Sequence, residues 1–327
     1  MTTHRSTVCR LVATAALVGI GSRAVAVEGG TGAYLPGSRD TMAGIAPPPG
    51  SYFTIDVFRL ESTAPFLPIN GLVLSDVTSS ATVTKFNFTH SFDSSLWGGQ
   101  PYITVTLPYV TGSLSFAGEL KNGFAGGFTD EQSGMGDLTI TPALGYHSGK
   151  HHWIYAASIF APTGYYEPAT FNIAAREASV LSFGKNRWAI APTVAYTYLD
   201  MTSGVELSAS GSITFSQRND ASDYQTAPEI LLEMAALQHL PSGFAFGLTG
   251  YVYQQTGDDS GSGADAVRNV TNAESLQASL QGIGPIITYG TKIGGRAVSM
   301  KLKYVSEMNA RRRFESDVVA ASFNIAF

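Results

Sequence analysis

The sequence is poor in cysteine, in charge and in long apolar segments. Its single cysteine, Cys9, lies in an N-terminal stretch expected to be removed, which excludes disulfides and thiolate metal sites from the mature chain. Charged residues make up 14% of the 327 residues, against roughly 25% in typical soluble proteins. No mature segment approaches the roughly 18–20 unbroken apolar residues of a membrane helix. Together with 35 glycines and 11% aromatic residues, these absences favour a membrane β-barrel.

The N-terminus has the pattern of an export signal. A short basic region precedes an apolar stretch at 11–20, and Ala24-Val25-Ala26 fits a small-x-small cleavage site. We therefore predict a secretory signal peptide over residues 1–26. Its removal leaves a mature net charge of about −8, which argues against nucleic acid as a partner.

The C-terminal segment alternates between apolar and small or polar side chains. One face carries Val319, Ala321, Phe323, Ile325 and Phe327, and the residues between them form the other face. A strand with a period of two places these sets on opposite sides of a sheet. A transmembrane barrel needs this arrangement, with apolar residues toward lipid and polar ones toward a wet lumen. The segment also resembles the C-terminal signature of bacterial outer-membrane barrels, which implies the barrel-assembly machinery as a partner through Phe327.

The rest of the chain can be divided into strands joined by alternately long and short connections. Short periplasmic turns, longer external loops and an even strand number are typical of outer-membrane barrels. We predict an all-β fold, a single antiparallel up-and-down transmembrane barrel of about twelve strands, with ten or fourteen as alternatives. The barrel occupies residues 51–327, preceded by a Gly- and Pro-rich periplasmic arm or lumenal hatch at 27–50. The expected strands lie near 51–60, 82–92, 101–115, 135–147, 152–163, 186–199, 204–216, 227–239, 243–255, 275–289, 296–306 and 314–327.

Prolines within several expected strands conflict with this fold. Proline cannot donate a ladder hydrogen bond, and an unpaired carbonyl opposite it is costly in lipid. Such residues should lie at bulges or near the rims. At Gly282-Ile283-Gly284-Pro285 the alternation slips by one residue, which predicts a bulge.

Several motifs resemble one family of membrane proteins. They are Glu28–Gly37 (EGGTGAYLPG), Gly134–Leu138 (GMGDL), Ala161–Tyr165 (APTGY), Gly184–Trp188 (GKNRW), Gly250–Gln255 (GYVYQQ) and Gly284–Tyr289 (GPIITY). In this order they resemble the MetA-pathway of phenol degradation family of outer-membrane transporters. The resemblance spans almost the whole mature chain and implies a barrel, often encoded among aromatic-degradation functions. It implies no functional residues that can be placed on this sequence.

The residues that could carry catalysis or bind metal are poorly placed for it. His90 is followed by Ser91 and Asp93, but neighbours on a strand point to opposite faces, which opposes a Ser-His-acid site. The same divergence opposes metal binding by His151-His152, which fit a solvated turn better. We therefore expect no enzyme, no metal and no cofactor.

Charged and aromatic residues of the strands are the candidate functional residues, because alternation turns them toward the lumen. Charges of both signs could pair across the lumen and partly close it, and they argue against a strongly ion-selective pore. The candidates are Asp56, Lys85, Asp137, Arg187, Glu206, Glu229, Glu233, Tyr251, Tyr253, Lys301 and Lys303.

A run of three arginines lies in the last expected external loop. Arginine forks suit phosphate groups, so Arg311, Arg312 and Arg313 are candidates for contact with lipopolysaccharide. A solvated run of charge explains them equally well.

The function predicted from these patterns is passive uptake of small hydrophobic or aromatic compounds across the bacterial outer membrane. A narrow lumen with some aromatic lining suits such solutes. The main alternative is a non-transporting structural or adhesive barrel in the same membrane. A barrel hydrolase is a weaker alternative.

Overall fold

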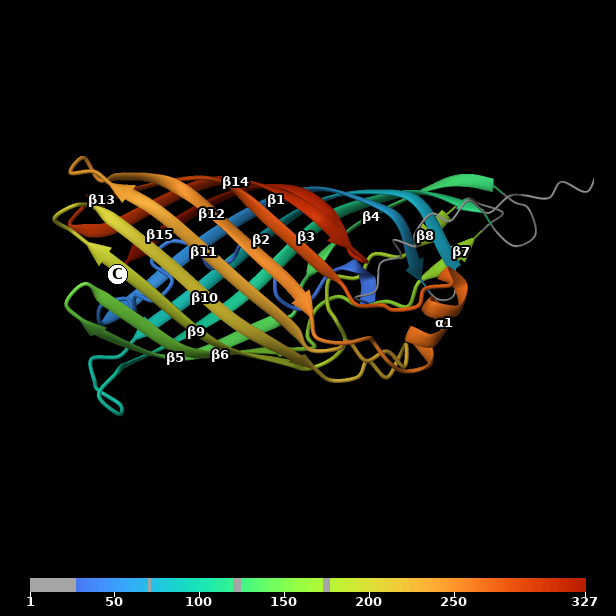
Figure 1. The fold of residues 1–327 in the computed structure, drawn as a ribbon, viewed down its shortest axis with the longest axis horizontal. Helices are drawn as coiled ribbons and strands as arrows, with labels where there is room; N and C mark the ends of the chain where they lie inside the picture. The colour runs from blue at the N-terminus through green and yellow to red at the C-terminus, as the bar shows by residue number, and fades with distance from the viewer. Residues whose placement is uncertain (1–27, 70–71, 120–124, 173–176) are drawn as a thin grey trace, which may run out of the picture.

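The barrel predicted from the sequence is present in the structure. The computed structural model describes residues 28–69, 72–119, 125–172 and 177–327, so the expected signal peptide at 1–26 lies outside the described residues. Twelve antiparallel strands close into a cylinder, shown in Figure 1. The barrel strands are β1 (Gly50–Ile69), β2 (Leu72–Ser91), β3 (Gln100–Glu119), β5 (Leu138–Ser148), β6 (His151–Ala161), β9 (Ala189–Asp200), β10 (Val205–Ser216), β11 (Glu229–His239), β12 (Phe244–Gln255), β13 (Ser279–Ile293), β14 (Arg296–Arg311) and β15 (Glu315–Ala326).

The barrel is closed by pairing its first strand with its last. β1 pairs with β2 on one side and with β15 on the other, for example Phe53 with Ile325. The backbone N–H of Phe327 donates to Ser51 O at 2.9 Å, so the ladder of this seam reaches the last residue. Closure leaves no sheet edge in the hydrocarbon, where unpaired backbone groups would be costly.

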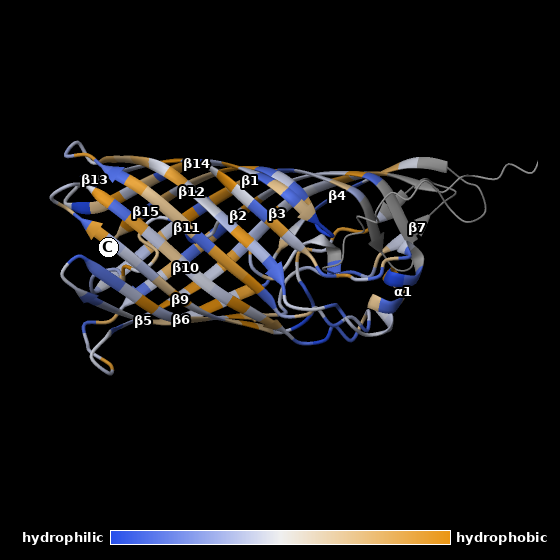
Figure 2. Cartoon of the chain, in the orientation of Figure 1, coloured by the Kyte–Doolittle hydropathy of each residue, from blue (hydrophilic) through white to orange (hydrophobic). Residues whose placement is uncertain are grey.

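The side chains alternate as a membrane barrel requires. In β10, Leu207, Ile213 and Phe215 are exposed on the outer surface, while the polar residues between them are buried inside. Figure 2 shows this alternation as orange segments that take turns with paler and blue ones along the strands. A soluble barrel would reverse this arrangement, because water favours burial of apolar surface. The outer face is therefore the lipid-facing surface.

The two ends of the cylinder differ in their connections. Short turns, such as Gly294-Gly295 between β13 and β14, lie at the end where the chain terminates (Figure 1). The opposite end carries the longer loops, with helix α1 (Ser262–Thr271) and the small hairpin of β7 (Thr170–Asn172) and β8 (Glu177–Ser179). We call these the turn end and the loop end. No helix among the described residues is both long and apolar enough to cross a membrane.

The longest strand outside the twelve barrel strands is β4 (Ala125–Met135), which was not predicted. β4 pairs with the half of β3 nearer the loop end, from Tyr109 onward. The half of β3 nearer the turn end pairs with β5. The sequence analysis placed this segment in a loop, because its glycines and polar residues do not alternate. Beyond the lipid neither face of a hairpin needs to be apolar, so this strand has no alternation to detect.

The bulge expected at Pro285 is absent. Pro285 lies opposite Leu248 of β12 in an unbroken register. On its other side the β13–β14 pairing omits Gly284 and Pro285 but continues in the same register beyond them, and the irregularity lies instead between Ser279 and Gln281. Pro285 therefore interrupts the pairing of β13 with β14, and no residue is inserted into the strand to form a bulge.

Candidate functional site

The lumen contains a segment of the chain that precedes the first strand. Residues 28–49, called the arm here, are irregular apart from a short 3-10 turn at Glu28–Gly30. Glu28 contacts residues at the loop end, whereas Gly44 N donates to Thr197 Oγ1 at 2.9 Å near the turn end of β9. The arm therefore runs through the barrel interior from the loop end to the turn end. Its glycines and prolines keep it out of the surrounding sheet.

At the loop end the arm is held through the Glu28 carboxylate. It forms an ion pair with the fully buried guanidinium of Arg187. It also accepts hydrogen bonds from Asn219 Nδ2 at 2.8 Å and from the Ser222 hydroxyl. Arg187 donates in turn to Thr226 Oγ1 at 2.8 Å. A carboxylate with a charged partner and two neutral donors is well compensated for its loss of water.

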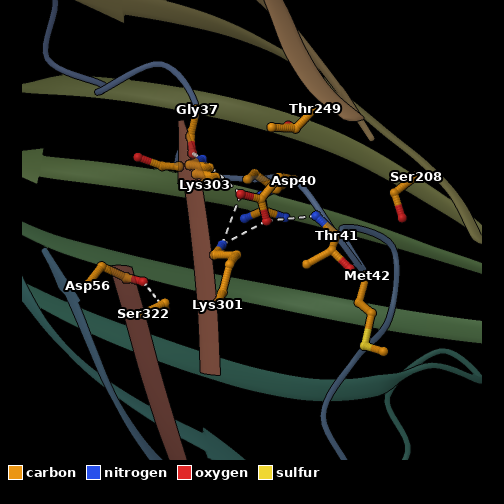
Figure 3. A network of polar contacts seen from close by, with 12 residues as sticks. Gly37, Asp40, Thr41, Met42, Asp56, Ser208, Thr249, Lys301, Lys303 and Ser322 are labelled. Atoms are coloured by element: carbon orange, nitrogen blue, oxygen red, sulfur yellow. Dashed lines mark hydrogen bonds and ion pairs between the residues drawn. The ribbon is translucent and has the colours of Figure 1, made fainter. Parts of the chain in front are cut away.

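In the middle of the lumen the arm is held by a carboxylate between two lysines. Asp40 is 3% exposed and lies 2.7 Å from Lys301 Nζ and 2.8 Å from Lys303 Nζ, as Figure 3 shows. Lys303 also donates to the carbonyl of Gly37. Both lysines project from β14, two residues apart on its inner face. One arm carboxylate thus stabilises two cations that would otherwise repel each other.

Two glutamates of the barrel wall bind the arm backbone. Glu206 accepts hydrogen bonds from Met42 N at 2.6 Å and from Thr41 Oγ1 at 2.9 Å, and it also contacts His239 Nε2 at 2.6 Å. Glu233 accepts from Arg39 N at 3.2 Å and from the Tyr34 hydroxyl at 3.0 Å. An irregular segment has backbone N–H groups that no strand satisfies, and these carboxylates satisfy two of them.

Near the turn end the arm touches the wall so closely that only glycine fits. A methyl group on Gly44 would lie 2.5 Å from Thr197 N and 2.7 Å from His152 O, both backbone atoms that cannot move aside. On the wall side, a methyl group on Gly145 would collide with Ala46 of the arm. The arm and the wall are therefore matched in shape here and pack directly against each other.

The arm does not fill the whole lumen. A cavity of about 890 Å³ lies between the arm and the inner wall and extends to the outer loops. Its apolar lining comes from the arm, from the strands and from the loops, with Leu35, Val110, Phe160, Phe183 and Phe314 among it. Charged groups, among them Lys85 and Arg313, line it as well. The cavity is large enough for a small organic molecule.

The loop end is covered by a packed cluster of loops that includes α1. Tyr224, Ala264, Val267, Ala273 and Leu276 form its apolar interior. At its edge the buried carboxylate of Asp259 accepts hydrogen bonds from the Tyr224 hydroxyl at 2.6 Å, from Ala227 N at 2.8 Å and from Gln255 Nε2 at 2.8 Å. Despite these donors, burial raises the pKa of Asp259 to about 6.

This raised pKa predicts a dependence of stability on pH. A carboxyl whose folded pKa lies above its unfolded value of 3.8 binds its proton more tightly in the folded protein. The folded state should therefore gain stability as the pH falls from 7 toward 5. We expect the melting temperature of the wild type, measured relative to that of Asp259→Asn, to be higher at pH 5 than at pH 7. An equal difference at both pH values would contradict the assignment.

Among the predicted lumen residues, Asp137 and Arg187 lie in the connections that precede β5 and β9, and the others lie on the inner side of the strands. Glu206, Glu229, Glu233, Tyr251, Tyr253, Arg187 and Lys303 are buried, and Asp56, Lys85, Asp137 and Lys301 are half-buried. The expectation of charges pairing across the lumen is wrong for the described ion pairs that involve the predicted cations, because Arg187, Lys301 and Lys303 each pair with an acid of the arm. These cations are therefore neutralised by the arm, which lies inside the barrel, and not by acids on the opposite side of the wall.

The remaining candidates have neutral partners. Asp137 accepts from Gly164 N at 2.9 Å and Lys185 N at 2.8 Å, so it organises loops and is not a free lumen charge. Asp56 is held by Asn87 Nδ2 at 2.8 Å and by Ser322. Lys85 donates to Ser38 Oγ of the arm at 2.7 Å.

The sequence analysis did not single out Glu28 and Asp40, the two acids of the arm. A signal for them exists in the sequence. The arm carries these two acids within a Gly- and Pro-rich segment, and several predicted lumen positions are cations. Since a buried cation needs a partner, the arm acids were the natural candidates once the arm was placed inside the barrel.

The three consecutive arginines do not act as one surface cluster. Arg311 is exposed and Arg312 is half-buried. Arg313 is 7% exposed and lies over the ring of Tyr253, 4.1 Å from its centroid, at the cavity. The expectation that it contacts lipopolysaccharide is therefore wrong for Arg313, because the chain turns inward before β15. For Arg311 and Arg312 it stays a prediction.

With this geometry established, the chain can be compared with known proteins. The profile of the family described as "Putative MetA-pathway of phenol degradation" matches residues 63–323. The chain belongs to this family. The match covers most of the barrel and confirms the resemblance drawn from the short motifs. Curated protein sequences yield no match.

Solved structures share the barrel architecture. The COG4313 outer membrane channel from Pseudomonas putida F1 superposes with a TM-score of 0.62 at 16% identity, covering 90% of this chain and 100% of that one. A Pseudomonas aeruginosa FadL homologue gives a TM-score of 0.42 at 7% identity, covering 84% of this chain and 89% of that one. The first likeness supports the fold. The fold is that of a bacterial outer-membrane barrel, which places this family member in that membrane.

Proposed function

We propose that this protein is an outer-membrane channel for the passive uptake of small hydrophobic, in particular aromatic, compounds. The observation that carries the proposal is the cavity of about 890 Å³ inside the barrel. A purely structural barrel would pack its interior, whereas this one keeps a space lined by aliphatic and aromatic side chains. Membership of the family described as a pathway of phenol degradation agrees with such a solute.

The arm defines the route that a solute must take. A solute entering from the loop end reaches the cavity beside the arm, but the close packing of Gly44 and Gly145 blocks the path to the turn end. Passage therefore requires the arm to shift at its turn end while the wall stays intact. The arm acts as a hatch. Because the outer membrane offers no nucleotide or ion gradient to this chain, the solute crosses by diffusion.

The structure does not bring together His90 and Ser91, the pair considered for the weaker hydrolase alternative. His90 is exposed on the outer face, where its Nδ1 lies 3.0 Å from Ser51 Oγ. Ser91 points to the other side, is buried and donates to Pro47 O at 2.8 Å. The strand thus separates the two residues that a hydrolase would need together.

Whether uptake needs the cavity can be tested by filling the cavity with a larger side chain. Val110 and Leu107 lie on opposite faces of β3, the first lining the cavity and the second exposed to lipid. We expect Val110→Trp to reduce the uptake of radiolabelled phenol several-fold in cells that depend on this channel, because the indole occupies the space that the solute needs. The measurement is the initial uptake rate at low phenol concentration.

The matched control is Leu107→Trp, which adds the same indole to the lipid face and should leave uptake unchanged. A labelled sugar and a labelled amino acid should enter no faster with the channel than without it. If cells with the wild-type protein take up phenol no faster than cells without any, the protein is a structural or adhesive barrel and not a channel.

A further inference from the structure

The cavity contains a buried cation whose hydrogen-bonding capacity is not used. Arg313 is more than nine-tenths buried, and its Nε and Nη1 atoms have no hydrogen-bond partner among the residues that the structure describes. One face of its guanidinium is covered by the ring of Tyr253. A buried guanidinium with unused donors is costly unless an anion completes its coordination.

Two further cations of the cavity lining, Lys85 and Lys185, also form no close ion pair, although the charges of neighbouring carboxylates act on both. Lys85 donates to Ser38 Oγ and Lys185 donates to Thr31 Oγ1, each at 2.7 Å. Within the described part of the chain, neither these lysines nor Arg313 takes part in an ion pair. The hydroxyl partners hold the lysine side chains in place without neutralising them.

Three of the acids that line the same cavity are already engaged by donors. Glu307 accepts from the Tyr251 hydroxyl at 2.6 Å and from Ser316 N at 2.7 Å. Asp56 accepts from Asn87 and Ser322, and Glu28 pairs with Arg187. The charge of Glu307 also acts on Arg313, but its carboxylate accepts its hydrogen bonds from Tyr251 and Ser316, so the Nε and Nη1 donors of Arg313 stay unused. The cavity is therefore complementary to an anion.

We infer that the cavity binds small aromatic carboxylates, with Arg313 holding the carboxylate group and the aromatic wall holding the ring. This inference rests on the proposed uptake function and names a substrate class for it. The guanidinium can donate two parallel N–H bonds to a carboxylate, the geometry in which arginine binds most strongly. Rings that line the cavity, among them Tyr34, Phe160, Phe183 and Phe314, offer stacking and edge contacts to a flat solute.

The test is a calorimetric titration of the purified full-length protein in detergent with benzoate. The wild type should bind benzoate saturably, and Arg313→Gln should weaken that binding about tenfold or more, the effect of losing a charged hydrogen-bonded partner. Arg311→Gln changes the exposed arginine two residues away and should bind like the wild type. Benzamide, a neutral isostere, should bind more weakly than benzoate and respond little to Arg313→Gln.

Three results would overturn the inference. They are benzoate binding unaffected by Arg313→Gln, an equal loss of benzamide binding in that variant, and binding of acetate as tight as that of benzoate. Should Arg313→Gln not fold, Lys85→Gln replaces it. It alters a half-buried lining cation and should weaken benzoate binding several-fold, and an unchanged affinity there would count against the inference.

Phenol uptake, measured in the same variants, separates this inference from the proposed function. If phenol is taken up but the affinity for benzoate is unchanged in Arg313→Gln, the anion site is refuted and the channel function is retained. Benzoate binding that depends on Arg313 without any solute uptake supports the site and refutes transport.

Discussion

Deleting residues 27–48 should raise the single-channel conductance of the barrel in planar bilayers several-fold. The arm packs against the backbone near Thr197 and against Gly145 at the turn end, so its removal should leave a continuous water-filled lumen. The wall should survive the deletion, because its ladder and its lipid-facing side chains do not depend on the arm. The charges exposed by the deletion would be solvated by the water that replaces it.

Two controls make this result interpretable. The shortened protein must keep the circular dichroism of a β-barrel and its resistance to unfolding by detergent without heat. A deletion confined to residues 95–98, at the tip of the exposed turn between β2 and β3, removes chain from the same end and should leave conductance unchanged. An unaltered conductance in a folded barrel without the arm would refute the hatch.

Replacing Asp40 by Asn should destabilise the folded protein by about 3–5 kcal/mol, the usual cost of removing one partner from a buried ion pair. The variant leaves Lys301 and Lys303 as neighbouring cations with no carboxylate between them. The arm would then lose its hold in the middle of the lumen, and the closed state should open more often. Equilibrium unfolding in detergent measures the first effect, and the open probability in bilayers measures the second.

The charge explanation can be separated from a packing explanation by removing all three charges. A variant that combines Asp40→Asn with Lys301→Gln and Lys303→Gln has no unpaired lysine and should recover much of the lost stability. A loss below about 0.5 kcal/mol in Asp40→Asn, the range of ordinary surface substitutions, would show that the lysines find other partners and that Asp40 does not hold the arm.

The barrel strands could be found from the sequence because a membrane strand alternates apolar side chains that face lipid with polar side chains that face the lumen. Leu207 and Ile213 face lipid wherever the neighbouring strands lie, and the polar residues between them face inward for the same geometric reason. All twelve barrel strands were therefore predicted near their observed positions. β4 was missed because it lies beyond the lipid, where nothing selects for alternation.

The partners of the inward residues could not be found in this way. Alternation places Lys301 and Lys303 inside the barrel, but their partner is more than 260 residues away and belongs to a segment with no periodicity. Arg313 follows two arginines in a loop, and only the inward turn of the chain before β15 separates its role from theirs. A period of two reports which face a residue occupies, and it carries no information about what lies across from that face.

The local pattern of this chain thus determines a membrane barrel, its strands and its lipid surface. Each strand has lipid on one face and the lumen on the other, so each must show the alternation independently of the other strands. The path of the arm, the pairing of its two acids with wall cations and the cavity left beside it depend on the closed cylinder as a whole. They arise only when segments far apart in the chain share one narrow interior, where each buried charge must find whichever partner the fold brings within reach.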